Sequence, residues 1–451
     1  MNKKMKDPNK LSFGKTLAFS GVGISKAVDF ILLGYLTYFC TNILGVSATL
    51  VGTMLLVSKV FDGITDIIAG LIIDRTKTRF GKGRPYDLLI VVEWVLTVIL
   101  FWCPVESNTA KAAWIFIMYT LINSIIVTLL SAAEPIYVGR SIKYNEDRAK
   151  ALSVNGLLTT IFCTIISILF PIMMGTKLGT TAIGWAKMSL MVGVPMSIIG
   201  LTRFFAFKET VIPDNETMAD KVKFKDMLDS VKNKYIWIIC GTTIMIGLMT
   251  NTISAVQTYY FDYVVGDVQL LSTIGMIGII TPFFMLLMPV LLRKMSVKSI
   301  FCAASVLGAI ACFVRIFAGA NIPVLILSAA LQGLASMPFS YFTTLLVIDV
   351  MDFGEWKTGK RVEGAVSAVN GFAGKVASGL SSGFVGLYMG VTGFDGTLET
   401  QSAATINSIV ALYSWIPAIF FVLTFVFMFL YDLDKKMPEI KSDLEVRRKS
   451  A

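Results

Sequence analysis

The sequence contains no histidine and few charged residues, and these absences exclude several classes of protein. Of 451 residues, 16% are charged and 55% are apolar, whereas soluble domains carry about 25% charged residues. Without histidine, no histidine-based acid–base catalysis, metal site or proton relay is available. The six cysteines stand singly within apolar runs without a CxxC pair, so neither a disulfide framework nor a zinc site is indicated. The chain is too apolar for a water-soluble domain.

Twelve apolar runs are long enough to cross a membrane as helices. A bilayer core of about 30 Å needs about 20 apolar residues per helix. The runs are continuous rather than alternating, which favours helices over barrel strands. The predicted spans are 17–41, 48–73, 87–105, 112–138, 151–175, 183–204, 236–263, 270–292, 299–317, 322–349, 363–391 and 405–431. The sequence therefore predicts an all-α membrane protein with twelve transmembrane helices in the lipid bilayer.

Lysine and arginine are distributed unequally between alternate loops. If the N-terminus lies in the cytoplasm, 33 of the 40 Lys and Arg residues fall in cytoplasmic segments and 3 fall on the opposite side. This asymmetry follows the positive-inside rule and predicts that both termini are cytoplasmic, in a protein of the cell membrane. It also accounts for the formal net charge of +10 without a nucleic-acid partner.

The longest hydrophilic stretch, 205–235, divides the spans into two groups of six. Its apolar residues recur at helical spacing among lysines, which predicts an amphipathic linker helix on the inner membrane surface. We expect the domains to be 1–204, the linker 205–235, 236–431 and a tail at 432–451. A short echo, Ser-Val-Asn-Gly at 153–156 and Ser-Ala-Val-Asn-Gly at 367–371, indicates two related halves, as in secondary transporters.

Ionisable residues inside the predicted spans are candidate functional residues. A charge at the bilayer centre costs at least about 2.5–3.5 kcal/mol, so each one needs a reason. Lys59, Asp62 and Asp66 follow one another at offsets that place them on one helical face. Two carboxylates one turn apart need a positive partner, which is a bound Na⁺ or Li⁺, a proton, or a lysine. In the last case, Lys59 forms a buried salt bridge that only fixes helix packing.

Four further ionisable residues lie within the predicted spans. Lys26 and Asp29 are one helical turn apart, so they either pair with each other or face a ligand. Glu134 precedes Pro135, which kinks the helix, and it either lines a cavity or lies near the inner surface. Lys375 has no acidic neighbour in its own helix, so we expect it to reach the second-span carboxylates or a substrate.

Two other charged residues are expected to have structural roles. Glu93, in the third span, is interpreted as a helix-packing or interface residue. Arg315 lies three residues from the outer end of its helix, where a long side chain can extend its charge to the membrane surface. Neither is expected to contact a ligand.

The charged loop after the second span carries the most specific motif. It reads Asp-Arg-Thr-Lys-Thr-Arg-Phe-Gly-Lys-Gly-Arg-Pro-Tyr over 74–86, shortly after Asp-Gly-Ile-Thr-Asp over 62–66. Two other segments are Tyr-Tyr-Phe-Asp-Tyr-Val-Val-Gly at 259–266 and Asp-Phe-Gly-Glu-Trp-Lys, followed by Arg-Val-Glu, within 352–363. Together these segments resemble the major facilitator superfamily, and more specifically the glycoside–pentoside–hexuronide:cation symporters, over most of the chain.

This resemblance implies a fold, an activity and a set of partners. The fold would be the major facilitator fold, two six-helix halves that alternate access to a central site. The activity would be import of a glycoside or related sugar by a monomer, coupled to Na⁺, Li⁺ or H⁺, with no other cofactor. Within that family the charged loops act as cytoplasmic gates. The gating residues implied here are Asp74, Arg75, Arg79, Arg84, Arg148, Glu355, Arg361 and Glu363.

The resemblance also implies a cation site and a substrate site. The cation-site carboxylates match Asp62 and Asp66, and the hydroxyl ligand of the fourth helix matches Thr128. Thr65 stands where the family has an asparagine, which leaves Na⁺, Li⁺ and H⁺ all open. The candidate substrate-binding residues are Lys26, Asp29, Ser131, Lys375, Asn155 and Glu134.

The substrate positions depart from the family pattern. Lys26 and Ser131 stand where the family has aspartates, and Asn155 or Gly156 stands where it has an arginine. An ammonium group is a hydrogen-bond donor only, so we hypothesise an anionic substrate, either a uronide or a sulfonated or carboxylated glycoside.

Two other functions stay open, and a third is not expected. Loss of the family's sugar contacts also fits a facilitator or exporter of an amphipathic lipid or steroid. A membrane ligand sensor is a further alternative, although such sensors usually bring a larger signalling domain than the short tail at 432–451. We expect no enzymatic activity, because the sequence offers no nucleophile–base constellation, HExxH motif or P-loop.

Overall fold

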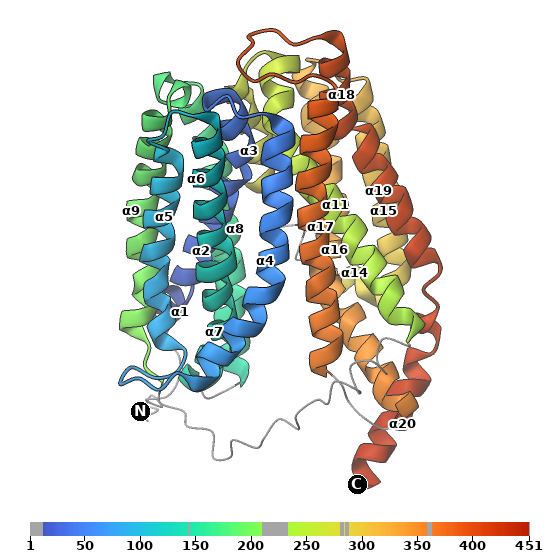
Figure 1. Cartoon of the computed structure of the whole chain (residues 1–451). Coiled ribbons are helices and arrows are strands. Elements are labelled where there is room, and N and C mark those ends of the chain that lie inside the picture. The colour runs from blue at the N-terminus through green and yellow to red at the C-terminus, as the bar shows by residue number, and fades with distance from the viewer. Residues whose placement is uncertain are drawn as a thin grey trace, which may run out of the picture. The chain divides into compact units, whose positions relative to one another are not determined.

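The computed structural model describes most of the chain as helix (Figure 1). The residues described are 12–142, 145–209, 233–279, 284, 288–358 and 363–450. Within these ranges there is no strand, only an isolated bridge between Thr78 and Gly81. Two compact units emerge from the contacts. Unit 1 comprises Met1–Asn215, Val268–Met276 and Asp395–Glu399, and unit 2 comprises Glu216–Asp267, Ile277–Phe394 and Thr400–Ala451.

Unit 1 contains the first six predicted spans. Its principal helices are α1 (Phe13–Phe19), α2 (Gly21–Gly34), α3 (Leu36–Tyr38), α4 (Ala48–Arg75), α5 (Leu89–Trp102), α6 (Asn108–Thr120), α7 (Thr128–Ser141), α8 (Asn145–Met174) and α9 (Ala182–Ala206). Short 3₁₀ and π turns join some of them, namely η1 (Phe39–Ile43), η2 (Arg84–Leu88), η3 (Leu121–Val127) and η4 (Lys177–Thr180). The segments η6 (Val268–Leu270) and α12 (Leu271–Gly275) belong to the same unit.

Unit 2 contains most of the remaining predicted spans. Its helices are α11 (Lys234–Tyr260), α14 (Met288–Lys294), α15 (Val297–Ile316), α16 (Ile322–Thr358), α17 (Glu363–Val391), α18 (Ala403–Tyr413), α19 (Trp415–Phe429) and α20 (Met437–Ser450). Its short turns are η5 (Phe261–Val265), η7 (Met276–Ile279, which begins in unit 1) and η8 (Leu433–Lys435). The predicted linker helix at 205–235 falls largely on 210–232, which lie outside the described residues.

Nine helical segments of the described ranges are long and apolar enough to cross a membrane. Two further long helices, α4 and α17, fall outside that set. The charged residues of α4 and the Gly and Ser residues of α17 lower the hydropathy of these two helices. In length, the 28 residues of α4 extend about 42 Å, which exceeds the thickness of a bilayer core. The predicted span 270–292 is only partly described, as the short segments α12, η7 and α14.

Several long helices begin at a serine or threonine whose side chain accepts a backbone N–H. The N-caps are Ser47 of α4, Ser107 of α6, Thr181 of α9, Ser296 of α15 and Ser402 of α18. Each satisfies one of the unpaired N–H groups of a helix N-terminus. These caps mark where the helices begin, at the start of the predicted apolar run for α4 and one to four residues before it for the others.

Aromatic side chains fill one end of unit 1, around Trp185 of α9. Its ring centroid lies 5.5 Å from that of Phe101, 5.2 Å from that of Phe39 and 5.6 Å from that of Phe170. Rings at these separations add stabilisation to their buried area. The cluster joins α5, η1 and α8 to α9.

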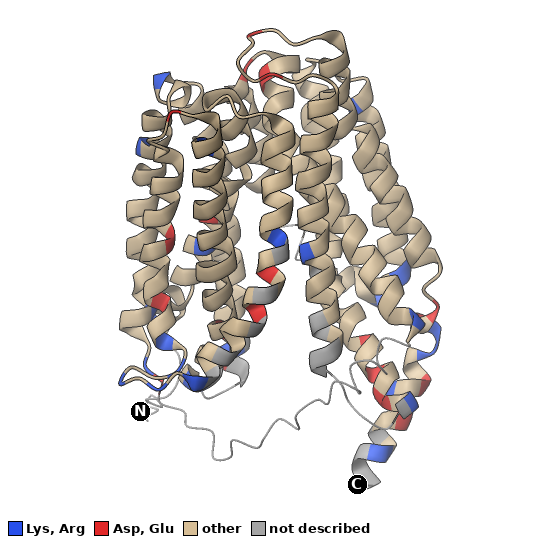
Figure 2. Cartoon of the chain, in the orientation of Figure 1, with Lys and Arg blue, Asp and Glu red and all other residues tan. Residues whose placement is uncertain are grey.

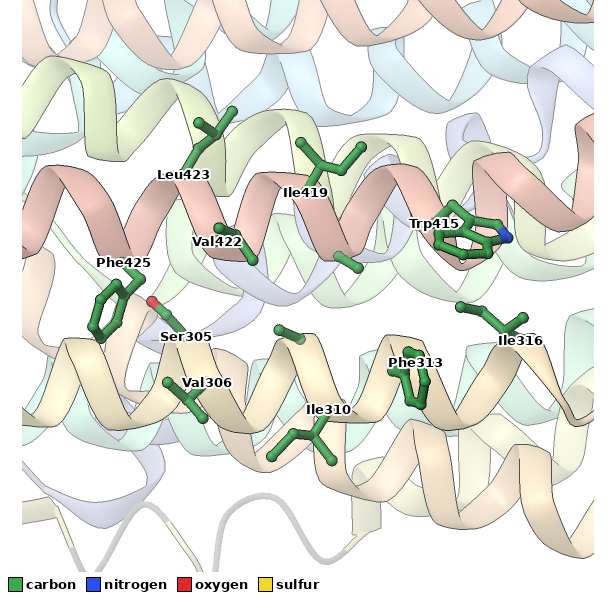
Figure 3. Close-up of a pocket in the computed structure, with 12 residues that line it drawn as sticks. Ser305, Val306, Ile310, Phe313, Ile316, Trp415, Ile419, Val422, Leu423 and Phe425 are labelled. Atoms are coloured by element: carbon green, nitrogen blue, oxygen red, sulfur yellow. The ribbon is translucent and has the colours of Figure 1, made fainter.

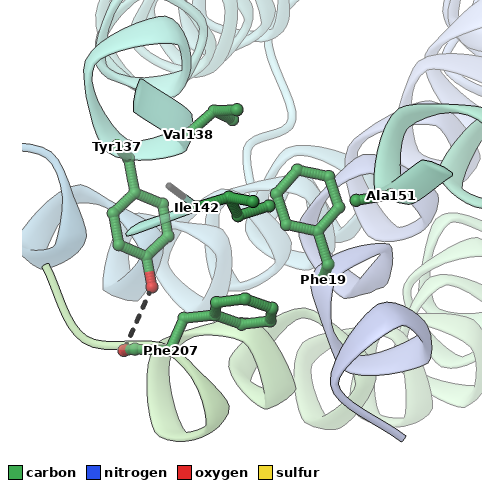
Figure 4. Packing of buried hydrophobic residues seen from close by; sticks show 6 residues of the cluster. All are labelled: Phe19, Tyr137, Val138, Ile142, Ala151 and Phe207. Carbon is green, nitrogen blue, oxygen red and sulfur yellow. Dashed lines mark hydrogen bonds between the residues drawn. The ribbon is translucent and has the colours of Figure 1, made fainter. Parts of the chain in front are cut away.

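A second buried cluster lies toward the opposite end of unit 1, where Phe19 and Phe207 pack edge to face with centroids 5.8 Å apart (Figure 4). Tyr137 and Ile142 of the α7 region and Ala151 of α8 complete the contact. The Tyr137 hydroxyl donates to the carbonyl of Phe207 at 3.3 Å, so a single side chain joins α7 to the end of α9.

Small residues allow close helix packing in unit 2. A Cβ at Gly308 would lie 2.1 Å from the ring of Phe421, and one at Gly247 would lie 2.6 Å from the Cβ of Ala377. Small residues at such crossings are a general feature of membrane helix pairs, since they let backbones approach closely. The pairs α15–α19 and α11–α17 therefore pack through glycine.

An apolar groove of about 570 Å³ runs between α15 and α19 (Figure 3). Ile310 and Phe313 on one helix and Trp415 and Ile419 on the other are exposed and line it. Only Ser305 brings a hydroxyl to the wall. Exposed apolar surface on membrane helices is the surface that lipid chains cover, and such a wall offers a sugar almost no hydrogen bonds.

Arg315 departs from the sequence expectation, because its side chain is buried rather than extended to the membrane surface. It is 1% exposed. Its guanidinium donates to the Ser328 hydroxyl at 3.0 Å, to the Tyr413 carbonyl at 2.9 Å and to the Gln332 side chain. Polar partners inside the unit outweigh the cost of desolvation, and they join α15, α16 and α18.

Candidate substrate and cation site

Charged residues interrupt long apolar stretches of helix at only a few places in unit 1 (Figure 2). Many of the remaining Lys and Arg residues of this unit lie toward the end at which α1 and α7 are found. The exceptions within the helices form three groups, which are described in turn: one around Asp62, one around Glu134 and one around Asp29.

Asp62 of α4 is held by two partners. Its Oδ2 lies 2.9 Å from Nζ of Lys59, and its Oδ1 accepts a hydrogen bond from the hydroxyl of Ser124. Asp62 is 4% exposed. The Lys59 ammonium also lies 5.4 Å from the ring centroid of Tyr119. Of the alternatives left open by the sequence, the salt bridge with Lys59 is therefore present.

The other predicted cation ligands make different contacts. Thr65 donates to the carbonyls of Phe61 and Asp62 at 3.1 and 3.2 Å. Thr128 donates to the carbonyl of Asn123 at 3.1 Å. Asp66 is exposed. Both threonine hydroxyls thus donate to backbone carbonyls of their own helical segments. That Asp66 and these threonines bind a cation stays a prediction.

A π-helical turn explains how Ser124 reaches Asp62. The segment η3, from Leu121 to Val127, widens the helix between α6 and α7. Such turns rotate the following side chains and recur at functional sites. Ser124 is fully buried, and no local sequence pattern predicts that a serine four residues before Thr128 donates to the Asp62 carboxylate.

Lys26, Ser131 and Glu134 come together from α2 and α7. Lys26 donates from Nζ to the Ser131 hydroxyl at 3.2 Å and lies 3.7 Å from Oε2 of Glu134. The side chains of Lys26 and Glu134 are 26% and 23% exposed. These three predicted substrate residues therefore form one cluster whose side chains are partly exposed.

A buried arginine continues this cluster into the unit. Arg203 of α9 lies with Nη1 3.2 Å from Oε1 of Glu134, and it contacts both carboxylate oxygens of Asp87, at 2.6 and 2.9 Å. Arg203 is 1% exposed, and its guanidinium stacks 5.1 Å from the ring centroid of Tyr137. A planar fork with two carboxylates satisfies most of its donors, so Lys26, Glu134, Arg203 and Asp87 form a continuous chain of alternating charge.

Asn155 and Lys375 complete the predicted substrate set. The Asn155 amide packs on α2, where a Cβ at Gly23 would lie 2.3 Å from its Oδ1. Gly23 is one turn before Lys26, so Asn155 faces the same stretch of α2. Lys375 lies in α17 of unit 2 and is partly buried, and its role stays a prediction.

Asp29 does not pair with Lys26, in contrast to one alternative left open by the sequence. Its carboxyl is fully buried and accepts a hydrogen bond from Thr97 at 2.8 Å. It interacts with Glu93 of α5, which is also fully buried. Asp29 is therefore separate from the Lys26 cluster and interacts with Glu93 instead.

The charged loop after α4 folds around one acidic side chain. The Glu209 carboxylate accepts the backbone N–H groups of Lys82, Gly83 and Arg84 at 2.9, 2.7 and 2.8 Å. Successive N–H groups that converge in this way make a binding site for an anion. Gly81 has a φ of 117°, and a Cβ there would lie 2.4 Å from the Glu209 carboxyl carbon. Glycine is therefore required at this turn.

The gating residues are placed only in part. Arg84 donates from Nε to the Phe204 carbonyl at 2.9 Å and stacks 4.6 Å from the Phe204 ring centroid, while Arg79 stacks 4.7 Å from the ring centroid of Phe80. Arg148 donates to the Ile142 carbonyl at 2.7 Å. The side chain of Arg75 is exposed and that of Glu355 is partly buried. Arg361 and the side chains of Asp74 and Glu363 lie outside the described residues.

Sequence reasoning missed four residues of these sites, Arg203, Asp87, Glu209 and Ser124, and the interaction of Glu93 with Asp29. Arg203 stands at the end of the predicted sixth span, where sequence position alone does not indicate burial. Asp87 was missed for the same reason at the start of the third span. Glu209, Ser124 and the role of Glu93 depend on contacts between residues more than thirty positions apart, which no local pattern reveals.

Known proteins resemble this chain over nearly its whole length. The isoprimeverose transporter of Lactiplantibacillus pentosus is 27% identical over 431 residues, covering 91% of this chain and 86% of that protein. A putative glycoside/cation symporter of Escherichia coli (strain K12) is 24% identical over 427 residues, covering 92% and 91%. The crystal structure of a D-xylose-proton symporter matches the fold with a TM-score of 0.68 at 16% identity, covering 94% and 99%.

The family described as MFS/sugar transport protein matches residues 20–435. This match takes in both units and every charged cluster described above. The chain is therefore a member of the MFS/sugar transport family, a polytopic membrane protein with the major facilitator fold, within the group of glycoside–pentoside–hexuronide:cation symporters.

Proposed function

We propose that this protein imports a glycoside or related sugar by cation-coupled symport. The observation that carries the proposal is the cluster of Lys26, Ser131 and Glu134, three hydrogen-bonding side chains of membrane-spanning helices that keep partial exposure. Sugar hydroxyls both donate and accept, and this cluster offers an ammonium donor, a carboxylate acceptor and a hydroxyl. The names of the two sequence relatives, an isoprimeverose transporter and a glycoside/cation symporter, support the same substrate class.

The charges of the cluster favour a neutral sugar over an anionic one. Lys26 and Arg203 carry two positive charges, and Glu134 and Asp87 carry two negative charges. An anionic sugar would have to displace Glu134 from Lys26, because the ammonium already has a carboxylate beside it. A uronide or sulfonated sugar is the second candidate, since Lys26 stands where the family has an aspartate.

The orientation and location follow from the charge distribution. With 33 of the 40 Lys and Arg residues on one side of twelve spans, we propose that both termini are cytoplasmic and that the protein resides in a bacterial cell membrane. The cation enters together with the sugar, and each must raise the affinity of the other by the same factor.

A ligand screen by thermal unfolding tests this function on the purified protein. Isoprimeverose and other neutral glycosides, glucuronides and a lysolipid are each added with and without Na⁺ and Li⁺ and at several pH values. We expect a glycoside to raise the melting temperature, to do so more strongly with the coupling cation present, and to lose this effect in Lys26→Met. Stabilisation by the lysolipid alone would contradict the proposal in favour of an amphipathic lipid carrier.

A further inference from the structure

Two carboxyl groups lie near the middle of the spans of unit 1, away from the Lys26 cluster. Asp29 is in α2 and Glu93 is in α5, and both side chains are 0% exposed. The helices α2 and α5 pack against each other, and each carboxyl lies within the electrostatic influence of the other. Buried carboxyls in a membrane segment are costly and mark functional positions by default.

Within the part of the chain that the structure describes, three of the four carboxyl oxygens have no hydrogen-bond donor. The Thr97 hydroxyl donates to Oδ1 of Asp29 at 2.8 Å, whereas Oδ2 of Asp29 and both oxygens of Glu93 have none. The nearby Trp94 indole donates instead to the Ser25 hydroxyl at 2.8 Å. An ionised carboxylate without donors is among the least favourable groups to bury, so these oxygens call for a positively charged ligand.

The surrounding helices do not supply that charge. Lys26 acts on Glu93 through its charge, but its ammonium is held by Ser131 and Glu134. The Arg203 guanidinium of α9 forms ion pairs with two other carboxylates, those of Asp87 and Glu134. The remaining basic residues described on the elements packed against α2 and α5 lie within two turns of an element's end, namely Lys15 on α1, Arg84 on η2, Lys111 on α6, Arg148 and Lys150 on α8, and Lys187 on α9.

We propose that Asp29 and Glu93 form a proton-binding acid pair and that H⁺ is the cation coupled to sugar transport. A proton suits the site because it needs no coordination shell and lets one carboxyl donate to the other. Two carboxyls that share a buried site cannot both ionise without large repulsion, so the pair holds at least one proton in this conformation. Binding and release of that proton change the charge of the site by one, which is the event that symport requires.

The proposal also explains how the acid pair is linked to the sugar cluster. Asp29 and Lys26 are on the same helix, one turn apart. A sugar that draws Lys26 away from Glu134 would change the field at the acid pair, since Lys26 already acts on Glu93. This part rests on the proposed function, whereas proton binding by the pair does not.

Infrared spectroscopy of the purified protein without sugar tests the acid pair directly. A protonated carboxyl in an apolar site gives a C=O stretching band that a carboxylate lacks. We expect this band at neutral pH in the wild type, a shifted or weaker band in Asp29→Asn and in Glu93→Gln, where one buried carboxyl remains, and its loss in the double variant Asp29→Asn/Glu93→Gln. The exposed substitutions Asp395→Asn and Glu106→Gln, combined as the matched control, should leave it unchanged. Absence of the band from the wild type, or an unchanged band in the double variant, would overturn the proposal.

Transport by reconstituted vesicles tests the coupling. In Asp29→Asn, we expect sugar accumulation driven by a pH gradient to fall to the level without a gradient, while exchange of external for internal sugar continues. Exchange needs no net proton movement, so it also reports that the variant is folded. Unchanged pH-driven accumulation would overturn the coupling role. Accumulation driven by Na⁺ but not by a pH gradient would also overturn it, yet would leave symport itself intact.

Discussion

The Lys26 ammonium lies 3.7 Å from Oε2 of Glu134, and the other oxygen of that carboxylate accepts from Arg203 at 3.2 Å. Glu134 therefore joins an accessible lysine of α2 to a buried arginine of α9. When a ligand binds Lys26 in place of Glu134, the Glu134 carboxylate keeps its contact with Arg203. Separation of Lys26 from Glu134 therefore has a low free-energy cost, because the carboxylate still has a positively charged partner.

Breaking the Lys26–Glu134 pair should weaken sugar binding more than it weakens the fold. A hydrogen bond to a charged group contributes about 1.5–3 kcal/mol, so Lys26→Met is expected to raise the sugar Kd about ten- to hundredfold. Equilibrium binding of the stabilising glycoside measures this loss. The double variant Lys26→Met/Glu134→Gln should bind the sugar no better than Lys26→Met, and binding at wild-type affinity in either variant would exclude the cluster as the sugar site.

The Asp87–Arg203 pair should be a determinant of stability. Asp87→Asn leaves a guanidinium that is 1% exposed beside a single carboxylate, and loss of one partner of a buried pair costs about 3–5 kcal/mol. We expect a clearly lower melting temperature for the purified variant, and a comparable loss in Arg203→Lys, which removes the two-pronged contact. Asp395→Asn, at an exposed aspartate, is the control. Equal melting temperatures for Asp87→Asn and Asp395→Asn would show that the pair contributes little.

The hydrogen bonds between Glu209 and the backbone of residues 82–84 should hold this loop in one conformation. Glu209→Ala removes an acceptor shared by three N–H groups, and Gly81→Ala forces a Cβ toward the same carboxylate in a left-handed conformation. Both changes are expected to speed amide hydrogen exchange in the loop at least tenfold. Glu209→Gln should have a smaller effect because an amide oxygen still accepts. Unchanged exchange in Glu209→Ala would mean that other contacts hold the loop.

The Lys59–Asp62 pair can be separated from cation binding by a double substitution. Each single variant, Lys59→Met or Asp62→Asn, leaves a nearly buried charge without its partner, so both should unfold at lower temperature than the wild type. The double variant, Lys59→Met/Asp62→Asn, is expected to recover most of that loss, because it contains neither of the two buried charges. A double variant as unstable as either single one would contradict the pairing. Cation-driven uptake by the double variant then shows whether Asp62 also binds the transported ion.

The fold was largely predictable because lipid imposes a strict pattern on sequence. The helices α5, α9 and α15 begin and end within three residues of their predicted spans. This agreement arises because a long apolar helix satisfies its own backbone hydrogen bonds in a bilayer. Lys26 and Glu134 could be predicted as site residues because few charged residues occur inside membrane spans.

The partners of those charges could not be predicted, because they depend on how helices rotate and cross. Asp29 is one turn from Lys26 in sequence, yet its carboxyl turns to Thr97 and Glu93. The π turn at 121–127 brings Ser124, rather than Thr128, to Asp62. A rotation of one helix by a single residue moves a side chain by about 100°, and sequence periodicity alone cannot resolve that.

Sugar accumulation by reconstituted vesicles under imposed ion gradients tests cation-coupled import most directly. The glycoside that stabilises the purified protein is supplied outside, and gradients of pH, Na⁺ or Li⁺ are imposed one at a time and then abolished with an ionophore. We predict accumulation above the external concentration under an inward pH gradient, and its collapse when the ionophore is added. Equilibration to equal concentrations under every gradient would contradict symport and identify the protein as a passive facilitator.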